Sequence, residues 1–192
     1  MIIPLDFREQ LEKCIKENTG TIFKNFFDEE DNPRWEDILQ CIYSEIEKDD
    51  TVNFVEQEKP YGNVLLSHKI YLVSHVERKR LEEYFPKLIN ALDTIENLTG
   101  IYIKPIGPKV CIGPHYIDFH TDNWDAFALH SEGKAKWILS DTNDGTGSYL
   151  EEFYPKRGDM IFFPKGIWHR IETQDSPRGG IQFNAQIINK PK

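Results

Sequence analysis

Three side chains in the second half of the sequence have the types and spacing of ligands for one divalent metal ion. His120 and Asp122 are separated by one residue, and in a β-strand residues i and i+2 project to the same side. His169 follows an apolar run and a turn, at the start of a later predicted strand. Two imidazoles and one carboxylate leave three coordination positions open, which is the ligand set of Fe(II) oxygenases. His120, Asp122 and His169 are therefore the predicted metal ligands, with Fe(II) as the metal.

The residues around this triad resemble the two sequence signatures of the cupin superfamily. The second signature, G-x5-P-x-G-x2-H, is matched at all four defining positions by Gly158, Pro164, Gly166 and His169. The first signature contains H-x-H-x3-E-x6-G, and the corresponding string here is His120-x-Asp122-x3-Ala126-x6-Gly133. A His-x-Asp pair alone is weak evidence, whereas both signatures in order and in register favour a metal site.

Ala126 stands where a cupin carries its fourth ligand, a glutamate. Its methyl group cannot bind a metal, so the site is expected to remain open for a bidentate cosubstrate and O2. The alternative interpretation of the two histidines is structural. In that case His169 caps a turn and His120 satisfies a hydrogen bond in the core.

The segment from about residue 100 to 190 resembles the Fe(II)/2-oxoglutarate oxygenases, especially the Jumonji-type and asparaginyl-hydroxylase-like cupins. In those enzymes the His-x-Asp pair is followed by an apolar strand and a G-x-K-x-W/hydrophobic motif, and here the motif position reads Gly133-Lys-Ala-Lys-Trp137. The resemblance implies a double-stranded β-helix that binds 2-oxoglutarate and O2. It also implies an enzyme that converts 2-oxoglutarate to succinate while it hydroxylates or oxidatively demethylates a C–H bond.

The sequence departs from the Jumonji pattern at the residue that would hold the distal carboxylate of 2-oxoglutarate. The family's lysine corresponds to Ala135. Prolyl-hydroxylase-like enzymes use an arginine about nine residues after the second histidine, and Arg178 has that spacing; a guanidinium suits bidentate carboxylate binding. Arg178 is the first predicted anchor and Lys136 the second, with Asn184 as a further cosubstrate contact. The alternatives are a solvated turn residue for Arg178 and a solvent-facing strand residue for Lys136.

The hydrophobic pattern predicts a mainly β fold, a cupin jelly roll with an N-terminal helical layer. Helical spacing appears over residues 7–18, 35–47 and 76–97, with Pro86 expected to kink the last helix or to mark its true first turn. Residues 63–76 read as a strand. Short strands follow at 101–106, 109–112, 125–130, 135–140, 148–153, 160–163, 168–172 and 180–188. The whole chain, 1–192, is expected to form one domain, in which residues 1–99 pack on a barrel core formed by 100–190.

Composition excludes several other classes of protein. The net charge is −9, from 32 acidic and 23 basic side chains, so no nucleic-acid partner is expected. No apolar run approaches the roughly 20 residues that a membrane-spanning helix needs, and no secretory signal is recognisable at the start. Three widely spaced cysteines indicate reduced thiols and exclude a thiolate zinc cluster. The expected location is the cytoplasm.

Two alternatives to a 2-oxoglutarate-dependent oxygenase stay open. One is a cupin metalloenzyme that needs no cosubstrate, such as a dioxygenase or isomerase of a small acid or sugar. The other is a non-catalytic cupin that senses a metal or ligand. The primary substrate, a peptide or a small molecule, is not readable from the sequence, and the helical layer is compatible with a peptide cleft, a buttress or a homodimer contact.

Overall fold

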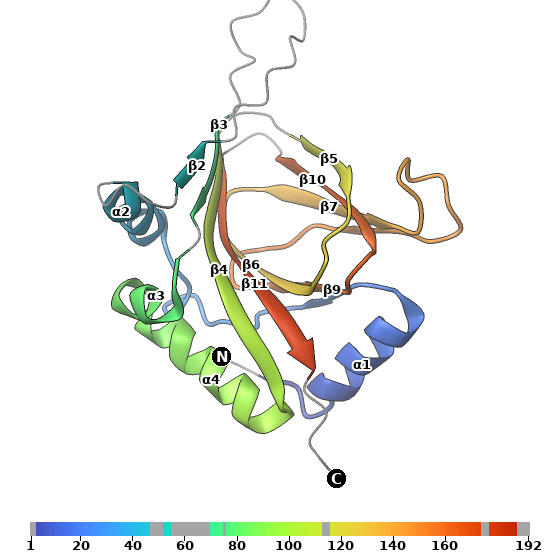
Figure 1. Ribbon diagram of the computed structural model, residues 1–192, viewed down its shortest axis with the longest axis horizontal. Coiled ribbons are helices and arrows are strands. Elements are labelled where there is room, and N and C mark those ends of the chain that lie inside the picture. The colour runs from blue at the N-terminus through green and yellow to red at the C-terminus, as the bar shows by residue number, and fades with distance from the viewer. Residues whose placement is uncertain are drawn as a thin grey trace, which may run out of the picture.

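A computed structural model describes residues 3–46, 52–54, 70–74, 76–112, 116–173 and 177–187. In these residues the strands form two antiparallel sheets, whose orders are β1-β9-β6-β11-β4-β3-β2 and β5-β10-β7-β8 (Figure 1). The strands are β1 (Thr21–Phe23), β2 (Val52–Phe54), β3 (Ile70–Ser74), β4 (Ile101–Ile112), β5 (Tyr116–His120), β6 (Asp125–Glu132), β7 (Ala135–Ser140), β8 (Leu150–Phe153), β9 (Met160–Phe163), β10 (Trp168–Thr173) and β11 (Arg178–Ile187). The predicted jelly roll is confirmed.

A layer of helices covers the outer face of the larger sheet, as predicted. The helices are α1 (Phe7–Glu17), α2 (Trp35–Ile46), α3 (Arg78–Tyr84) and α4 (Pro86–Thr99). Their apolar faces pack on alternate residues of β4, β6 and β11, including Ile103, Phe127 and Phe183, which are fully buried. The helices thus pack against one face of the larger sheet, and its other face lines the inside of the barrel.

A second, smaller core fills the space between the two sheets. Ala126, Ala128, Trp137, Phe163 and Ile171 are among its buried members. Strand β6 therefore buries both faces: Phe127 and Leu129 point to the helices, and Ala126 and Ala128 point inward. The strand alternation thus separates a helix-facing core from an inner face that can carry a site.

Several boundaries differ from the sequence prediction. One continuous strand, β4, replaces the two predicted at 101–106 and 109–112, because a register shift between Gln182 and Phe183 leaves Ile106 as an extra residue, while Gly107 and Pro108 stay paired with Gln182 and Ile181. Strands β1, β2 and β5 were not predicted; each is short and forms by pairing with another strand, β9, β3 and β10 respectively. Pro86 begins α4 at its first turn, so the third predicted helix is two helices.

Part of the strand predicted at residues 63–76 lies outside the described residues, and the described part is β3. None of the helices in the described ranges is both long and apolar enough to cross a membrane.

Candidate active site

The structure brings His120, Asp122 and His169 together at one point between the sheets. One nitrogen or oxygen atom from each of these side chains lies within 4.8 Å of the other two. His120 ends β5 and His169 lies in β10, where the two residues are directly paired and their rings are 4.2 Å apart between centroids. Asp122 lies two residues beyond the end of β5 and not on a regular strand, and its backbone carbonyl accepts a hydrogen bond from Gly166 N at 3.1 Å.

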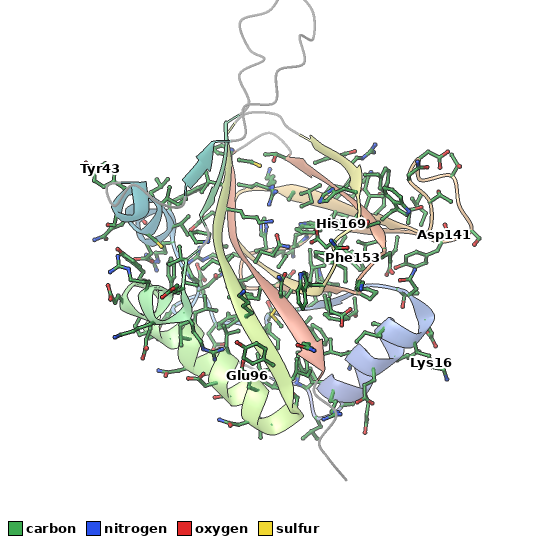
Figure 2. The ribbon with its side chains drawn as sticks, viewed as in Figure 1. Lys16, Tyr43, Glu96, Asp141, Phe153 and His169 are labelled. Atoms are coloured by element: carbon green, nitrogen blue, oxygen red, sulfur yellow. The ribbon has the colours of Figure 1, made fainter. Side chains whose placement is uncertain are left out.

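His169 is held as a neutral imidazole. Its side chain is 2% exposed and points between the sheets (Figure 2). Burial is the main cause that lowers the pKa of His169, the charge on His120 lowers it further, and Asp122 partly offsets both. Nδ1 donates a hydrogen bond to the Ile167 carbonyl at 3.2 Å. Nε2 is therefore the unprotonated nitrogen, which is the form that binds a metal.

The carboxylate of Asp122 is fixed by a side chain from the larger sheet. Gln182 in β11 donates a hydrogen bond from Nε2 to Oδ2 of Asp122 at 3.2 Å. Gln182 is itself 7% exposed. The same Oδ2 lies 3.9 Å from Nε2 of His169. A carboxylate that accepts such a bond keeps its orientation toward a metal shared with the two imidazoles.

A cavity adjoins the triad on the side of Gln182. Its empty volume is about 360 Å³, part of it open to solvent. It is lined by Lys109, Ala128, Leu129, His130, Trp137, Ile171, Arg178, Gly180, Ile181 and Gln182. Trp137 also stacks on the His169 ring, at 6.3 Å between centroids. Trp137 therefore borders both the cavity and the triad, and Gln182 lines the cavity while it hydrogen-bonds to the triad.

The charged residues in this lining are both cations. Arg178 is 5% exposed, and its Nε and Nη2 are buried with no hydrogen-bond acceptor among the described residues. Burial lowers the pKa of Lys109 to about 8, while the charge of Asp122 raises it and that of Arg178 lowers it. Buried guanidinium donors without a partner are costly unless an anion occupies the cavity, so the chemistry of this lining fits a carboxylate ligand.

Comparison with known proteins identifies the family. The sequence model described as JmjC domain matches residues 83–188, more than half of the 192 residues. This chain belongs to the JmjC domain family. Ribosomal oxygenase 2 from Bos taurus is 23% identical over 159 residues, which cover 72% of this chain and 31% of that protein. The JmjC chain thus spans less than a third of the length of this curated relative.

Solved structures show the same fold. A prolyl hydroxylase from Trichoplax adhaerens, in complex with a peptide fragment of hypoxia inducible factor, superposes with a TM-score of 0.57 at 11% identity and covers 94% of this chain and 89% of that one. The ribosomal oxygenase YcfD from Escherichia coli, in complex with cobalt and 2-oxoglutarate, has a TM-score of 0.54 at 13% identity, and the match covers 99% of this chain and 53% of that one. The resemblance to Jumonji-type cupins is confirmed.

The JmjC site does not gather all of the sequence-predicted residues. Ala126 lies on the inner face, so no fourth ligand comes from that position. Asn184 is half-buried and pairs with Ala126, which puts it on the same inner face, but it does not line the cavity. Lys136 lies on the other face of β7 from Ala135 and Trp137 and forms an ion pair with Glu152 at 2.5 Å. Arg178 is a buried strand residue and not a solvated turn residue.

Sequence reasoning missed Lys109 and Gln182. Each carries a weak local signal. Lys109 is a charged residue that directly precedes the apolar residues Val110, Cys111 and Ile112, and Gln182 has the same strand parity as Asn184. Their connection to the site depends on the pairing of β4, β11 and β6, which a local pattern does not contain.

Proposed function

We propose that this chain is an Fe(II)- and 2-oxoglutarate-dependent oxygenase. The observation that carries the proposal is the contact between an open His-Asp-His triad and an adjoining cavity that holds unpartnered guanidinium donors. A 2-oxo acid with a second carboxylate matches both features: its 2-oxo acid group suits the triad, and its second carboxylate suits the guanidinium. Membership of the JmjC domain family and the fold shared with a cobalt and 2-oxoglutarate complex support the same assignment.

His120, Asp122 and His169 are the residues that would hold the metal, and Arg178 is the residue that would receive the distal carboxylate. A bound Fe(II) would supply the redox chemistry for the reaction with O2. In the overall reaction 2-oxoglutarate loses one carboxylate as CO2 and becomes succinate. One oxygen atom of O2 enters succinate and the other enters the hydroxylated product. Trp137 and Phe163 place apolar rings against His169, which limits the access of water to that side of the triad.

A protein side chain is the substrate class that we infer first. A curated relative is called a ribosomal oxygenase, and a prolyl hydroxylase of the same fold was solved with a peptide fragment. A small-molecule substrate is the alternative. A homodimer, one domain over residues 1–192 and a cytoplasmic location remain predictions.

Succinate production from 2-oxoglutarate tests the proposed activity. We expect the Fe(II)-loaded protein to form succinate slowly without a primary substrate, as measured by NMR. D122N should reduce this to the background of the metal-free protein, because the amide no longer contributes a charged ligand. D6N is the matched control, because Asp6 is exposed and makes no side-chain cap on α1.

The opposite result is also defined. Metal binding with neither succinate formation nor 2-oxoglutarate binding in an anaerobic titration would contradict the proposal. It would favour a cupin metalloenzyme or a sensing module that does not use this cosubstrate.

A further inference from the structure

Lys109 belongs to the same inner face of the larger sheet as Arg178. In the ladder between β4 and β11, Lys109 is paired with Gly180, and Arg178 lies two residues before Gly180 on β11. Residues two apart on a strand project to the same side. Both side chains line the one cavity beside the triad, so the two cations approach it from neighbouring strands.

Gly180 leaves room between these side chains. It is paired with Lys109 on one side and with His130 on the other. A Cβ built at Gly180 would lie 2.4 Å from the carbonyl oxygen of Leu129, a distance that no side chain tolerates without movement of the backbone. The position therefore carries no side chain, so along the rung from Lys109 to His130 only the two end residues contribute side chains to the cavity.

The rest of the lining fits the other parts of a short dicarboxylate. Ala128, Trp137 and Ile171 provide apolar surface for methylene groups. Gln182 connects the cavity to Asp122, where a metal-bound 2-oxo acid would begin. No acidic side chain lines the cavity in the part of the chain that the structure describes. An anion between Lys109 and Arg178 would offset the repulsion between these two cations, of which Arg178 is buried and Lys109 half-buried.

We propose that Lys109 and Arg178 together bind the distal carboxylate of 2-oxoglutarate, in place of the β7 lysine whose position is Ala135. This inference rests on the proposed function. The guanidinium offers a planar pair of donors and the ammonium a compact point charge, so one carboxylate can accept from both. Ala135 on β7 points into the barrel and carries no charge, which leaves β4 and β11 to supply the cations.

The test removes a cation from the protein and, separately, the distal carboxylate from the ligand. Co(II)-loaded protein is titrated by calorimetry with 2-oxoglutarate and with 2-oxopentanoate, which has the same carbon chain without the distal carboxylate. We expect wild type to bind 2-oxoglutarate about 100-fold more tightly than 2-oxopentanoate, and K109M and R178M each to lose about tenfold or more of its 2-oxoglutarate affinity. Both variants should bind 2-oxopentanoate and Co(II) as wild type does, which also shows that they fold.

K136M is the matched control, because Lys136 is a lysine of the same barrel that is ion-paired with Glu152 on the outer face. It should bind 2-oxoglutarate as wild type does. An unchanged affinity in K109M, or a loss in K136M alone, would overturn the two-cation site while leaving the oxygenase assignment intact. Failure of wild type to bind 2-oxoglutarate would overturn both.

Discussion

At the scale of single residues, Gln182 connects the triad to the cavity. It lines the cavity and donates to Oδ2 of Asp122 at 3.2 Å. Asp122 lies beyond the end of β5, where no strand ladder orients its side chain. The hydrogen bond from β11 therefore has a positioning role, and Gln182 itself is not expected to bind the metal.

We predict that Q182L weakens Co(II) binding about 10- to 100-fold, which is the usual effect of removing a hydrogen bond to a metal ligand. The measurement is a Co(II) titration by calorimetry, together with the unfolding temperature of the metal-free protein. The latter should change little, since leucine fills a similar volume. Q186L, at an exposed position of the same strand, is the control, and equal Co(II) affinities in the two variants would contradict the prediction.

His130 is a second residue for which the structure predicts a measurable effect, because its side chain is only 4% exposed. Burial lowers the pKa of His130 to about 4, helped by the charges of Arg178 and Arg157 and opposed by the Gly133 carbonyl and Asp159. Its Nε2 donates to the Gly133 carbonyl at 3.0 Å. In the unfolded chain the pKa of His130 is near 6.5, so between pH 6.5 and pH 4 His130 is protonated in the unfolded chain and neutral in the folded chain. This contribution to stability is complete above pH 6.5 and is lost as the pH falls toward 4.

We predict that metal-free wild type loses on the order of 3 kcal/mol more than H130Q between pH 7 and pH 4. Glutamine keeps a donor for the Gly133 carbonyl but does not titrate. Urea unfolding at several pH values measures the free energy of unfolding of both proteins. In the difference between them, the contributions of the other titratable groups, His169 included, cancel. Parallel stability curves would show that His130 does not titrate in this way.

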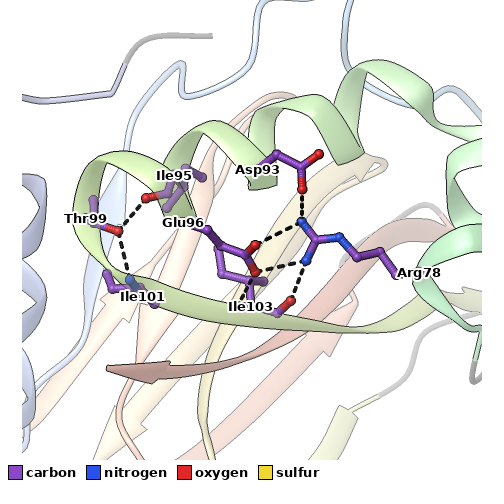
Figure 3. A network of polar contacts seen from close by, with 7 residues as sticks. All are labelled: Arg78, Asp93, Ile95, Glu96, Thr99, Ile101 and Ile103. Atoms are coloured by element: carbon purple, nitrogen blue, oxygen red, sulfur yellow. Dashed lines mark hydrogen bonds and ion pairs between the residues drawn. The ribbon is translucent and has the colours of Figure 1, made fainter. Parts of the chain in front are cut away.

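At the scale of elements, a partly exposed network of polar contacts joins α3, α4 and β4 (Figure 3). Nη1 of Arg78 donates to Glu96 Oε1 and to the Ile103 carbonyl, each at 2.9 Å, and Arg78 also contacts Asp93. Glu96 Oε1 accepts a hydrogen bond from Ile103 N at 2.7 Å. In the part of the chain that the structure describes, β3 pairs with β4 over Lys109 to Ile112 only. At Ile103 the network therefore hydrogen-bonds to backbone groups that no described β3 residue pairs with.

We predict that R78M lowers the free energy of unfolding by about 2 kcal/mol, because a half-buried carboxylate and a backbone carbonyl lose their donor. R80M should cost about 0.5 kcal/mol or less, since Arg80 forms a surface ion pair with Glu83 in the same helix. Chemical denaturation of the two variants measures both values. Equal losses would show that the network does not connect the helices to the sheet.

At the scale of the whole molecule, the site forms where the two sheets face each other. His120 and His169 belong to the small sheet, whereas Lys109, Arg178 and Gln182 belong to the large one. The helical layer packs on the opposite face of the large sheet and so stabilises the strands that carry the cavity. A jelly roll with the two histidines of the triad on one sheet and the two cations on the other can orient a ligand that has two acidic ends.

The sequence alone determined the triad, the jelly roll and the helical layer, because each depends on local spacing: a His-x-Asp pair, a G-x5-P-x-G-x2-H string, or a helical or strand period. The tertiary structure decided which cations face the cavity. The pairing of β4 with β11 places Lys109 beside Arg178, and strand alternation turns Lys136 outward. Strand pairing joins residues that are distant in the chain, and a shift of one residue reverses the face of every side chain. The three side chains of the triad could therefore be predicted from the order of residues. The cations beside them could not, because their position depends on which strands become neighbours.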